Sequence, residues 1–253
     1  MYFIIFLMTA FSQNECEKCS RIAILKLSEN IDNPSEAEIN CFLNSFDGSC
    51  MNNAEYSEWS NEVLYDLLEK FPERLITALE TDNQFNETEI LNEICNPLLD
   101  ENYDLIIETL LQLDKSDSRE LILLAVKIAK SFIIDSVEEK TYLNLNGNWA
   151  AKISSGQFII NLNIKNGNVK GYYCGYPDNL SKIDCKASDE AKDCPIKGII
   201  DHNQVLVLFT SCYSNETGKA LIEIVDEKLV WKTIIQPEGW HFVPSNSELQ
   251  RIE

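Results

Sequence analysis

Residues 157–175 read QFIINLNIK-NG-NVKGYYCG, and this stretch decides the fold of the second half of the chain. Asn166-Gly167 is a dipeptide that strongly favours a two-residue β-hairpin turn, because both residues tolerate a positive φ. Such a turn fixes the register of the flanking strands and places their apolar side chains on one face. The pairs that it predicts are Ile164 with Val169, Leu162 with Gly171, and Ile160 with Tyr173. The stretch therefore predicts an amphipathic hairpin with one face over a core.

Working outward from this hairpin, the period-2 pattern continues towards the C-terminus. Further strands are predicted at 196–200, 205–211, 219–225 and 229–235. This half opens near Gly147-Asn148-Trp149, where the apolar period changes from 3.6 to 2. We predict an α+β protein: an N-terminal all-α helical domain over 13–140, followed by an antiparallel β-barrel or sandwich over 141–253.

Four cysteines lie in the β half, at Cys174, Cys185, Cys194 and Cys212. A three-residue turn over 202–204 would place Cys194 directly opposite Cys212. Opposed Cβ atoms in an antiparallel pair lie ~4.5–5.5 Å apart, which is close to disulfide reach. Cys174 and Cys185 then remain to pair across the loop that follows the first hairpin. We predict both bridges.

The first half shows the helical period. Ser35-x-x-Glu38 forms a capping box, and Asn52-x-x-Glu55 and Asn86-x-x-Glu89 have the same spacing. Pro72 fits the first turn of a helix, where its missing N–H costs nothing. The helices predicted from these signals cover approximately 35–46, 52–71, 72–79, 86–97, 103–113 and 118–134.

The negative charge of the protein is concentrated in this helical half. The net charge is −20, from 41 acidic and 21 basic residues. Residues 13–140 hold 28 acidic and 10 basic side chains, whereas residues 141–253 hold 13 and 11. This composition argues against nucleic acid as a partner, which requires clustered Lys and Arg, and against an anionic membrane surface.

The longest predicted helix carries a row of carboxylates beside its apolar face. They follow one another at steps of three or four residues: Glu55, Glu58, Glu62, Asp66, Glu69 and Glu73. Like charges at this spacing destabilise a helix by ~0.2–0.5 kcal/mol per pair, and only Lys70 and Arg74 lie close enough in sequence to relieve them. One explanation is a solvated, solubilising face. The other is a docking surface for a basic protein, whose association the charges would steer.

The first residues of the chain indicate export. An apolar core within residues 1–13 is followed by Ala10-x-Ser12, small residues at signal-peptidase spacing. We expect residues 1–12 to be a signal peptide and the protein to be periplasmic or secreted; a buried N-terminal strand or helix is the alternative. Nine cysteines favour an oxidising compartment. No transmembrane segment is predicted, because no later stretch approaches 18 uninterrupted apolar residues.

Five cysteines belong to the helical half: Cys16, Cys19, Cys41, Cys50 and Cys95. Cys16-x-x-Cys19 could form a redox pair, but such motifs normally follow a strand, and no strand precedes this one. It could also bind a metal ion, but the sequence lacks a second pair of ligands at zinc spacing. The arrangement also resembles saposin-like domains, which implies Cys41 and Cys50 as the middle pair and a lipid-binding role. The cysteine that this family has near position 89 is absent here. Structural disulfides among the five are the favoured interpretation.

Two other resemblances concern larger parts of the chain. Residues 52–64, NNAEYSEWSNEVL, look like a helical family of exported bacterial proteins that has no assigned activity. Gly147-x-Trp149 with Arg251 resembles the calycin superfamily of avidin- and lipocalin-type barrels, in which this Trp packs under a basic residue of the last strand through a cation–π contact. Residues 229–231 and 249–251, LVW and LQR, also look like small exported β-domains, some of which are lysozyme-inhibitor-like.

The sequence contains no Gly-x-Ser-x-Gly, His-Glu-x-x-His or Walker motif, and its two histidines argue against a histidine triad or zinc site. A paired-carboxylate glycosidase stays open, because 41 acids always supply pairs. Trp149 is expected in the core. Trp240 and His241 follow a predicted turn and are candidates for surface recognition.

Together these observations predict an exported, non-enzymatic binding protein with no cofactor or metal, either inhibitor-like or immunity-like. Its acidic helical face would engage a basic protein, such as a cell-wall-degrading enzyme or a toxin. The alternative is a carrier of a small apolar ligand that uses a calycin-like β-domain.

Overall fold

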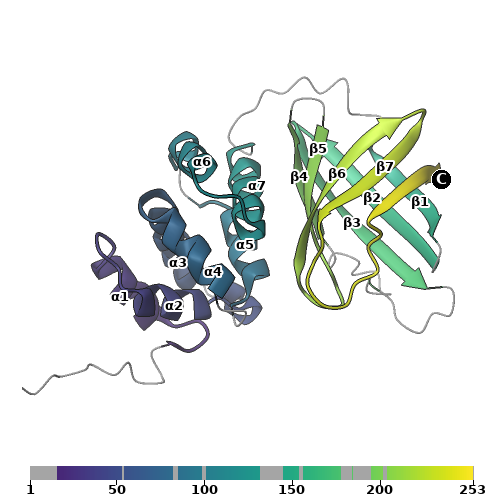
Figure 1. The fold of residues 1–253 in the computed structure, drawn as a ribbon. Coiled ribbons are helices and arrows are strands. Elements are labelled where there is room, and N and C mark those ends of the chain that lie inside the picture. Colours follow the sequence, from purple (N-terminus) through teal and green to yellow (C-terminus); the bar gives the residue numbers. More distant parts are fainter. Residues whose placement is uncertain are drawn as a thin grey trace, which may run out of the picture. The chain divides into compact units, whose positions relative to one another are not determined.

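The computed structural model describes residues 16–52, 54–81, 85–98, 101–131, 145–153, 156–177, 184, 195–201 and 204–252, without the side chains of 51–55, 177 and 201. The predicted α+β class is confirmed, since helices occupy the first half and strands the second (Figure 1). Two compact units are present. The first comprises Met1–Ile90 and Leu98–Asp100, and the second comprises Leu91–Pro97 and Glu101–Glu253. The predicted signal peptide, residues 1–12, lies outside the described residues.

The helices follow the predicted pattern closely. Their bounds are α1 Arg21–Glu29, α2 Glu36–Asn44, α3 Ala54–Lys70, α4 Pro72–Thr81, α5 Glu87–Ile94, α6 Tyr103–Gln112 and α7 Asp117–Ser131, with a 3₁₀ helix at Gly48–Asn52. The capping box at the start of α2 is present: the Ser35 hydroxyl accepts from Glu38 N, and the Glu38 carboxylate accepts from Ser35 N. Helix α1, capped by Ser20, was not predicted individually. In the described part of the chain, no helix is long and apolar enough to cross a bilayer.

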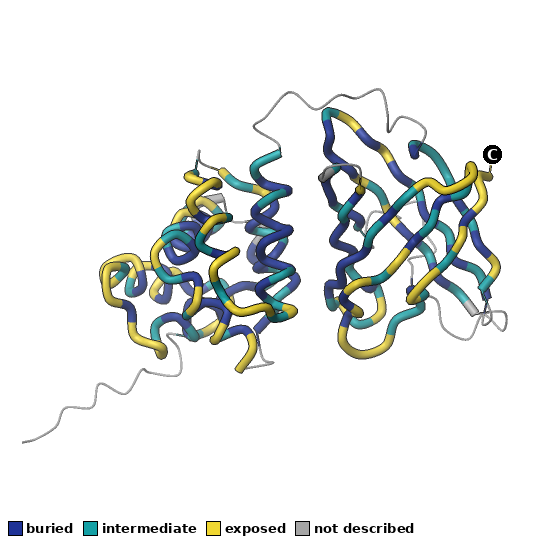
Figure 2. Tube along the Cα trace, turned by 45° about the horizontal axis from the view of Figure 1, so that its top comes forward, coloured by how far each residue is buried: buried dark blue, intermediate teal, exposed yellow. Residues whose placement is uncertain are grey.

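Helices α6 and α7 belong to the same compact unit as the strands. Helix α7 packs on α6 and on strands β4 Pro195–Asp201 and β5 Gln204–Thr210, and it is buried along most of its length (Figure 2). Ion pairs accompany this packing: Lys219 Nζ lies 2.9 Å from Glu120 Oε2, and the neighbouring Arg119 also pairs with Glu120. The buried residues of this unit therefore include those of α7, a helix that the sequence analysis assigned to the helical domain.

The strands form a closed eight-stranded antiparallel barrel with simple up-and-down order. The other strands are β1 Gly147–Ile153, β2 Gly156–Lys165, β3 Asn168–Pro177, β6 Thr217–Val225, β7 Lys228–Ile235 and β8 Asn246–Ile252. The three residue pairs predicted for the β2–β3 hairpin are confirmed, and Asn166 and Gly167 both have a positive φ at the turn. Of the two predicted β architectures, the structure is the barrel.

The predicted turn between β4 and β5 is wrong by one residue. Asp201 pairs with Gln204, so the connection has two residues rather than three, and Gln204 is the first residue of β5. The register of the β4–β5 ladder is therefore shifted by one residue from the predicted register. In this register Cys194 would no longer lie directly opposite Cys212. The error arose because a polar Gln at a strand end gives no sign of whether it belongs to the turn or to the ladder.

Large side chains fill the barrel interior. Four aromatic rings contact one another in a closed circuit: Phe158–Trp231, Trp231–Phe209, Phe209–Tyr173 and Tyr173–Phe158, with centroids 5.2–5.9 Å apart. All four side chains are buried. An eight-stranded barrel is just wide enough for its own side chains to fill. This barrel is therefore built around a packed aromatic core.

One end of the barrel carries the contact between Trp149 and Arg251 that the calycin resemblance implied. The Arg251 guanidinium carbon lies 4.6 Å from the centroid of the Trp149 ring, and its Nη1 donates to Asn146 O at 2.8 Å. The indole Nε1 donates to Leu145 O at 2.9 Å. Gly147 has φ +119°, and a Cβ there would lie 3.1 Å from Arg251 Nη1. The glycine thus makes room for the arginine.

We expect Arg251→Met to lower the free energy of unfolding by about 1 kcal/mol, because it removes the cation–π contact at a solvent-exposed position. Lys232→Met is the matched control, since Lys232 is an exposed cation on β7. Urea unfolding followed by near-ultraviolet circular dichroism measures both. Equal losses in the two variants would show that the contact with Trp149 contributes nothing specific.

Candidate functional site

The structure places the predicted acidic residues on two helices rather than one. Glu55, Glu58, Glu62, Asp66 and Glu69 belong to α3, which ends at Lys70, whereas Glu73 lies in the first turn of α4. The Glu55 side chain lies outside the described residues. At 3.6 residues per turn, the four described carboxylates of α3 fall within an arc of about 80°. We call them, together with Glu73, the acidic face.

The carboxylates of the acidic face have no hydrogen-bond or ion-pair partner within the described part of the chain. Glu58, Glu62 and Glu73 are exposed, and Asp66 and Glu69 are half-buried. The two nearby cations are engaged elsewhere. Lys70 Nζ pairs with Asp32 at 3.3 Å, and the Arg74 guanidinium lies 5.8 Å from the centroid of the Phe71 ring. The repulsion that the sequence implied is therefore not relieved by these two residues.

The opposite side of α3 is held firmly. Tyr56, Leu64, Leu67 and Leu68 are buried there. The Tyr56 hydroxyl donates to Ser45 O at 2.7 Å, which ties the first turns of α3 to the end of α2. The buried Asn61 accepts a hydrogen bond from Leu98 N at 3.0 Å. This anchoring fixes the direction in which the acidic face points.

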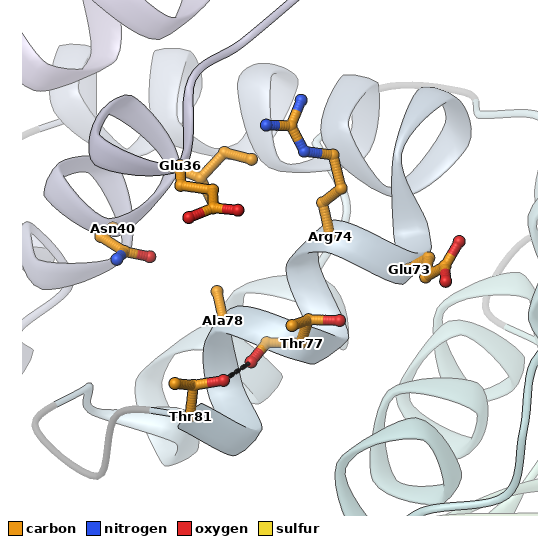
Figure 3. A pocket seen from close by; sticks show the side chains of 8 residues that line it. Glu36, Asn40, Glu73, Arg74, Thr77, Ala78 and Thr81 are labelled. Atoms are coloured by element: carbon orange, nitrogen blue, oxygen red, sulfur yellow. Dashed lines mark hydrogen bonds between the residues drawn. The ribbon is translucent and has the colours of Figure 1, made fainter.

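A groove of about 420 Å³ lies between α2 and α4, adjoining the acidic face at Glu73. Its lining residues are Glu36, Ile39, Asn40, Glu73, Arg74, Thr77, Ala78 and Thr81. In Figure 3, Glu36 and Asn40 reach from α2 towards α4, and Thr81 Oγ1 donates to Thr77 O at 2.6 Å. Glu36 has no polar partner in the described chain. With two carboxylates and one guanidinium, the lining is net negative.

The predicted disulfide residues of the β half are only partly described. Cys174 and Cys212 are each disulfide-bonded. Cys185 and Cys194 lie outside the described residues, so the pairing of the four remains a prediction. The helical half holds the bridges Cys16–Cys41 and Cys19–Cys50.

These two bridges settle the use of the Cys16-x-x-Cys19 segment. Each of its cysteines pairs with a different distant residue, so the segment is neither a redox pair nor a free ligand pair. A saposin-like arrangement implies a disulfide between Cys41 and Cys50. The structure instead pairs each of them with another cysteine. Cys95 is a buried free thiol, and burial raises its pKa to about 12. It therefore stays protonated at neutral pH and does not supply a nucleophile.

Sequence reasoning missed a buried carboxylate, Asp184, at the other end of the barrel from Arg251. Its Oδ1 accepts from Ser211 Oγ at 3.0 Å and Tyr213 N at 3.1 Å. Its Oδ2 accepts from Tyr173 OH at 3.1 Å and Phe242 N at 3.0 Å. Asp184 is fully buried, so it holds the surrounding loops and does not face a substrate. No periodic or motif signal marks it, because its partners are distant in sequence.

The surface-recognition candidates Trp240 and His241 lie in the connection between β7 and β8, near Asp184. The Trp240 side chain is exposed, and His241 is half-buried. Trp149, by contrast, is in the core as expected. Comparison with known proteins finds no match: no family model, no curated protein and no solved structure is similar to this chain.

Proposed function

We propose that the protein is an exported, non-enzymatic binding protein, inhibitor-like or immunity-like, that engages a basic protein through the acidic face. The observation that carries this proposal is the arrangement of five carboxylates that lie on α3 and the start of α4 and have no polar partner in the described chain. Their mutual repulsion destabilises the helix, and a cationic partner would remove this repulsion. A basic enzyme that degrades the cell wall, or a basic toxin, has the required charge.

The groove between α2 and α4 supports this proposal. A flat charged surface mainly raises the association rate, whereas a concave site can also fix the position of one side chain. Glu36 and Glu73 supply acceptors at the groove, and Thr77 and Asn40 supply neutral polar groups. We expect a lysine or arginine of the partner to enter it while other cations pair with the α3 carboxylates.

Export is consistent with the disulfides, which persist in oxidising compartments. The carrier alternative has less support, because the four aromatic rings occupy the barrel interior where an apolar ligand would bind. The calycin resemblance remains a proposal that rests on the closed barrel and the contact between Trp149 and Arg251.

The test compares two variants of equal net charge. Glu58→Gln/Glu62→Gln/Glu69→Gln neutralises the acidic face, and Glu223→Gln/Asp226→Asn/Glu227→Gln neutralises three carboxylates of the barrel. Each is immobilised beside the parent protein, and extract of the native source is applied at low and high salt. Quantitative mass spectrometry then identifies proteins that the parent and the barrel variant retain and the acidic-face variant loses. We expect such a protein to be basic and released by salt.

The affinity of the captured protein should fall about 10-fold for the acidic-face variant, equivalent to roughly 1.4 kcal/mol, and change little for the barrel variant. Two outcomes contradict the proposal. Either no protein distinguishes the two variants, or the distinguishing protein binds equally well at both salt concentrations, which excludes an electrostatic interface.

A further inference from the structure

Two aromatic side chains are exposed side by side at the end of the barrel opposite Arg251. Trp240 is 61% exposed and Tyr213 is 45% exposed, and their ring centroids lie 6.5 Å apart. They belong to different connections, the one between β5 and β6 and the one between β7 and β8. Exposed large aromatics close together on a folded domain are typical of recognition sites.

The two connections are fixed to each other by contacts between side chains and backbone groups. Ser211 Oγ accepts from Tyr213 N and from Ser214 N, both at 3.1 Å, and lies 3.4 Å from Trp240 O. Gly239 has φ +73°, and a Cβ there would lie 3.3 Å from Ser214 Cβ. Both connections also donate a backbone N–H to Asp184. The aromatic pair is thus held in place before any partner arrives, which reduces the entropic cost of binding.

The same two connections carry a pair of carboxylates, Glu216 and Glu238. Burial raises the pKa of Glu216, and the negative charge of Glu238 raises it further. Neither carboxylate has an ion pair within the described residues. Each of the two connections therefore carries one exposed aromatic residue and one acid, Tyr213 with Glu216 and Glu238 with Trp240.

We propose that Tyr213, Trp240, Glu216 and Glu238 form a site for an arginine side chain of a protein or peptide partner. A guanidinium is planar, stacks on aromatic faces and donates to carboxylates, so it matches both features of the surface at once. An uncharged apolar partner would use the rings but leave the two acids repelling each other. The site belongs to the barrel and includes no residue of the acidic face, so it goes beyond the function proposed for that face.

The arginine would remove the repulsion between Glu216 and Glu238 as well as cover the rings. Two consequences follow. Binding should weaken as salt concentration rises, because exposed charges are screened. The pKa of Glu216 should fall when the site is occupied, because a nearby cation favours the ionised form.

The experiment uses the full disulfide-bonded protein and the peptide acetyl-Gly-Arg-Gly-amide, followed by ¹⁵N and ¹³C nuclear magnetic resonance. The matched peptide carries citrulline, which has nearly the same shape and no charge. We expect the arginine peptide to shift the Trp240 indole and Tyr213 amide signals, with an affinity at least 10-fold above that of the citrulline peptide. The ¹³C titration of Glu216 should move to lower pH when the arginine peptide is added.

Variants separate the two parts of the site. Trp240→Ala should weaken arginine-peptide binding by about 2- to 30-fold, the range of a cation–π contact. Glu216→Gln/Glu238→Gln should weaken it and remove most of its salt dependence. Glu223→Gln/Asp226→Asn is the control of equal charge, and the triple variant of the acidic face on α3 should bind the peptide as the parent does.

Several results would overturn the proposal. They are equal binding of the arginine and citrulline peptides, undiminished binding to Trp240→Ala, and loss of binding in the control of equal charge. Binding of chitohexaose to Trp240 with no response to the arginine peptide would assign the aromatic pair to carbohydrate instead. A failed capture experiment on the acidic face leaves these peptide measurements unaffected, so the two proposals fail separately.

Discussion

Replacement of Asp184 by alanine should lower the free energy of unfolding of the barrel by about 3–5 kcal/mol, because buried donors are left without their acceptor. Four donors lose Asp184 as an acceptor: the hydroxyls of Tyr173 and Ser211 and the backbone amides of Tyr213 and Phe242. Tyr213 N and the Ser211 hydroxyl keep second acceptors in Ser211 Oγ and Trp240 O, so the main cost falls on Tyr173 and Phe242. A buried donor left without an acceptor costs about 1–3 kcal/mol, and hydrogen bonds to a charged group are the stronger kind. Burial and the adjacent Asp184 charge both raise the pKa of Tyr173, so its hydroxyl stays a donor.

Hydrogen exchange measured by mass spectrometry tests this loss, because it reports the barrel strands separately from the helices. The protection of backbone amides from exchange should fall first in β3, which contains Tyr173, and in β5, which ends just before Ser211 and Tyr213. Asp184→Asn should cost less, since one carbonyl oxygen remains while the new amide group opposes two donors. Glu223→Ala, on a carboxylate without these bonds, should cost less than about 0.5 kcal/mol. If Asp184→Ala matches Glu223→Ala, the network does not hold the barrel end together.

Asp184 also links stability to recognition. The amides of Tyr213 and Phe242 that it binds belong to the two connections that present the exposed aromatic pair. Asp184 does not reach the proposed arginine, so it is a positioning residue. In Asp184→Asn the affinity for the arginine peptide should fall even at temperatures where the barrel remains folded. The Glu216 response to the peptide should shrink in parallel.

Features set by local sequence were predictable from the chain alone. The hairpin register followed from Asn166-Gly167, because a two-residue turn leaves one register for the alternating apolar side chains. The helix starting at Pro72 and the capping box at Ser35 followed from rules that act within one turn. The cation–π contact of Trp149 with Arg251 followed from a resemblance and was confirmed by the geometry.

Features set by contacts between distant segments were not predictable. Asp184 binds donors that lie 11 to 58 residues away, and an isolated Asp in a loop usually signals a solvated turn. The bridges of the helical half join residues 25 and 31 positions apart, and five cysteines permit many pairings. The acidic residues of α3 and the helix break before Pro72 were predicted, but the groove beside Glu73 was not, because it depends on the packing of α2 near α4.

The second large effect on stability is expected when either of the two disulfides of the helical half is removed. Cys19→Ala/Cys50→Ala opens a loop of 31 residues, and chain-entropy reasoning gives a loss of about 3–4 kcal/mol in the free energy of unfolding. Cys16→Ala/Cys41→Ala opens a loop of 25 residues and should cost nearly as much. Helices α1 and α2 should be the most affected, because each is only nine residues long and depends on tertiary contacts to remain helical. Hydrogen exchange in α1 and α2 measures the loss.

Cys95→Ala is the control, because it removes a buried cysteine without opening a bridge; we expect a cost of about 1 kcal/mol. The pH dependence gives a second check on the Cys19→Ala/Cys50→Ala variant. The hydrogen bond from Lys18, with those from Ser49, lowers the pKa of Asp47 to about 2. Since this is below the unfolded value, the Asp47 contribution to stability is complete above about pH 4 and is lost as the pH falls towards 2.

Lys18 adjoins Cys19, and Asp47 lies three residues before Cys50, so the bridge holds this ion pair together. The bridge-free variant should therefore lose less stability between pH 4 and pH 2 than the parent does. If it unfolds at the parent's denaturant concentration and keeps the parent's acid response, the bridge is dispensable. In that case α3 and α4 would need another brace to hold the acidic face in a fixed direction.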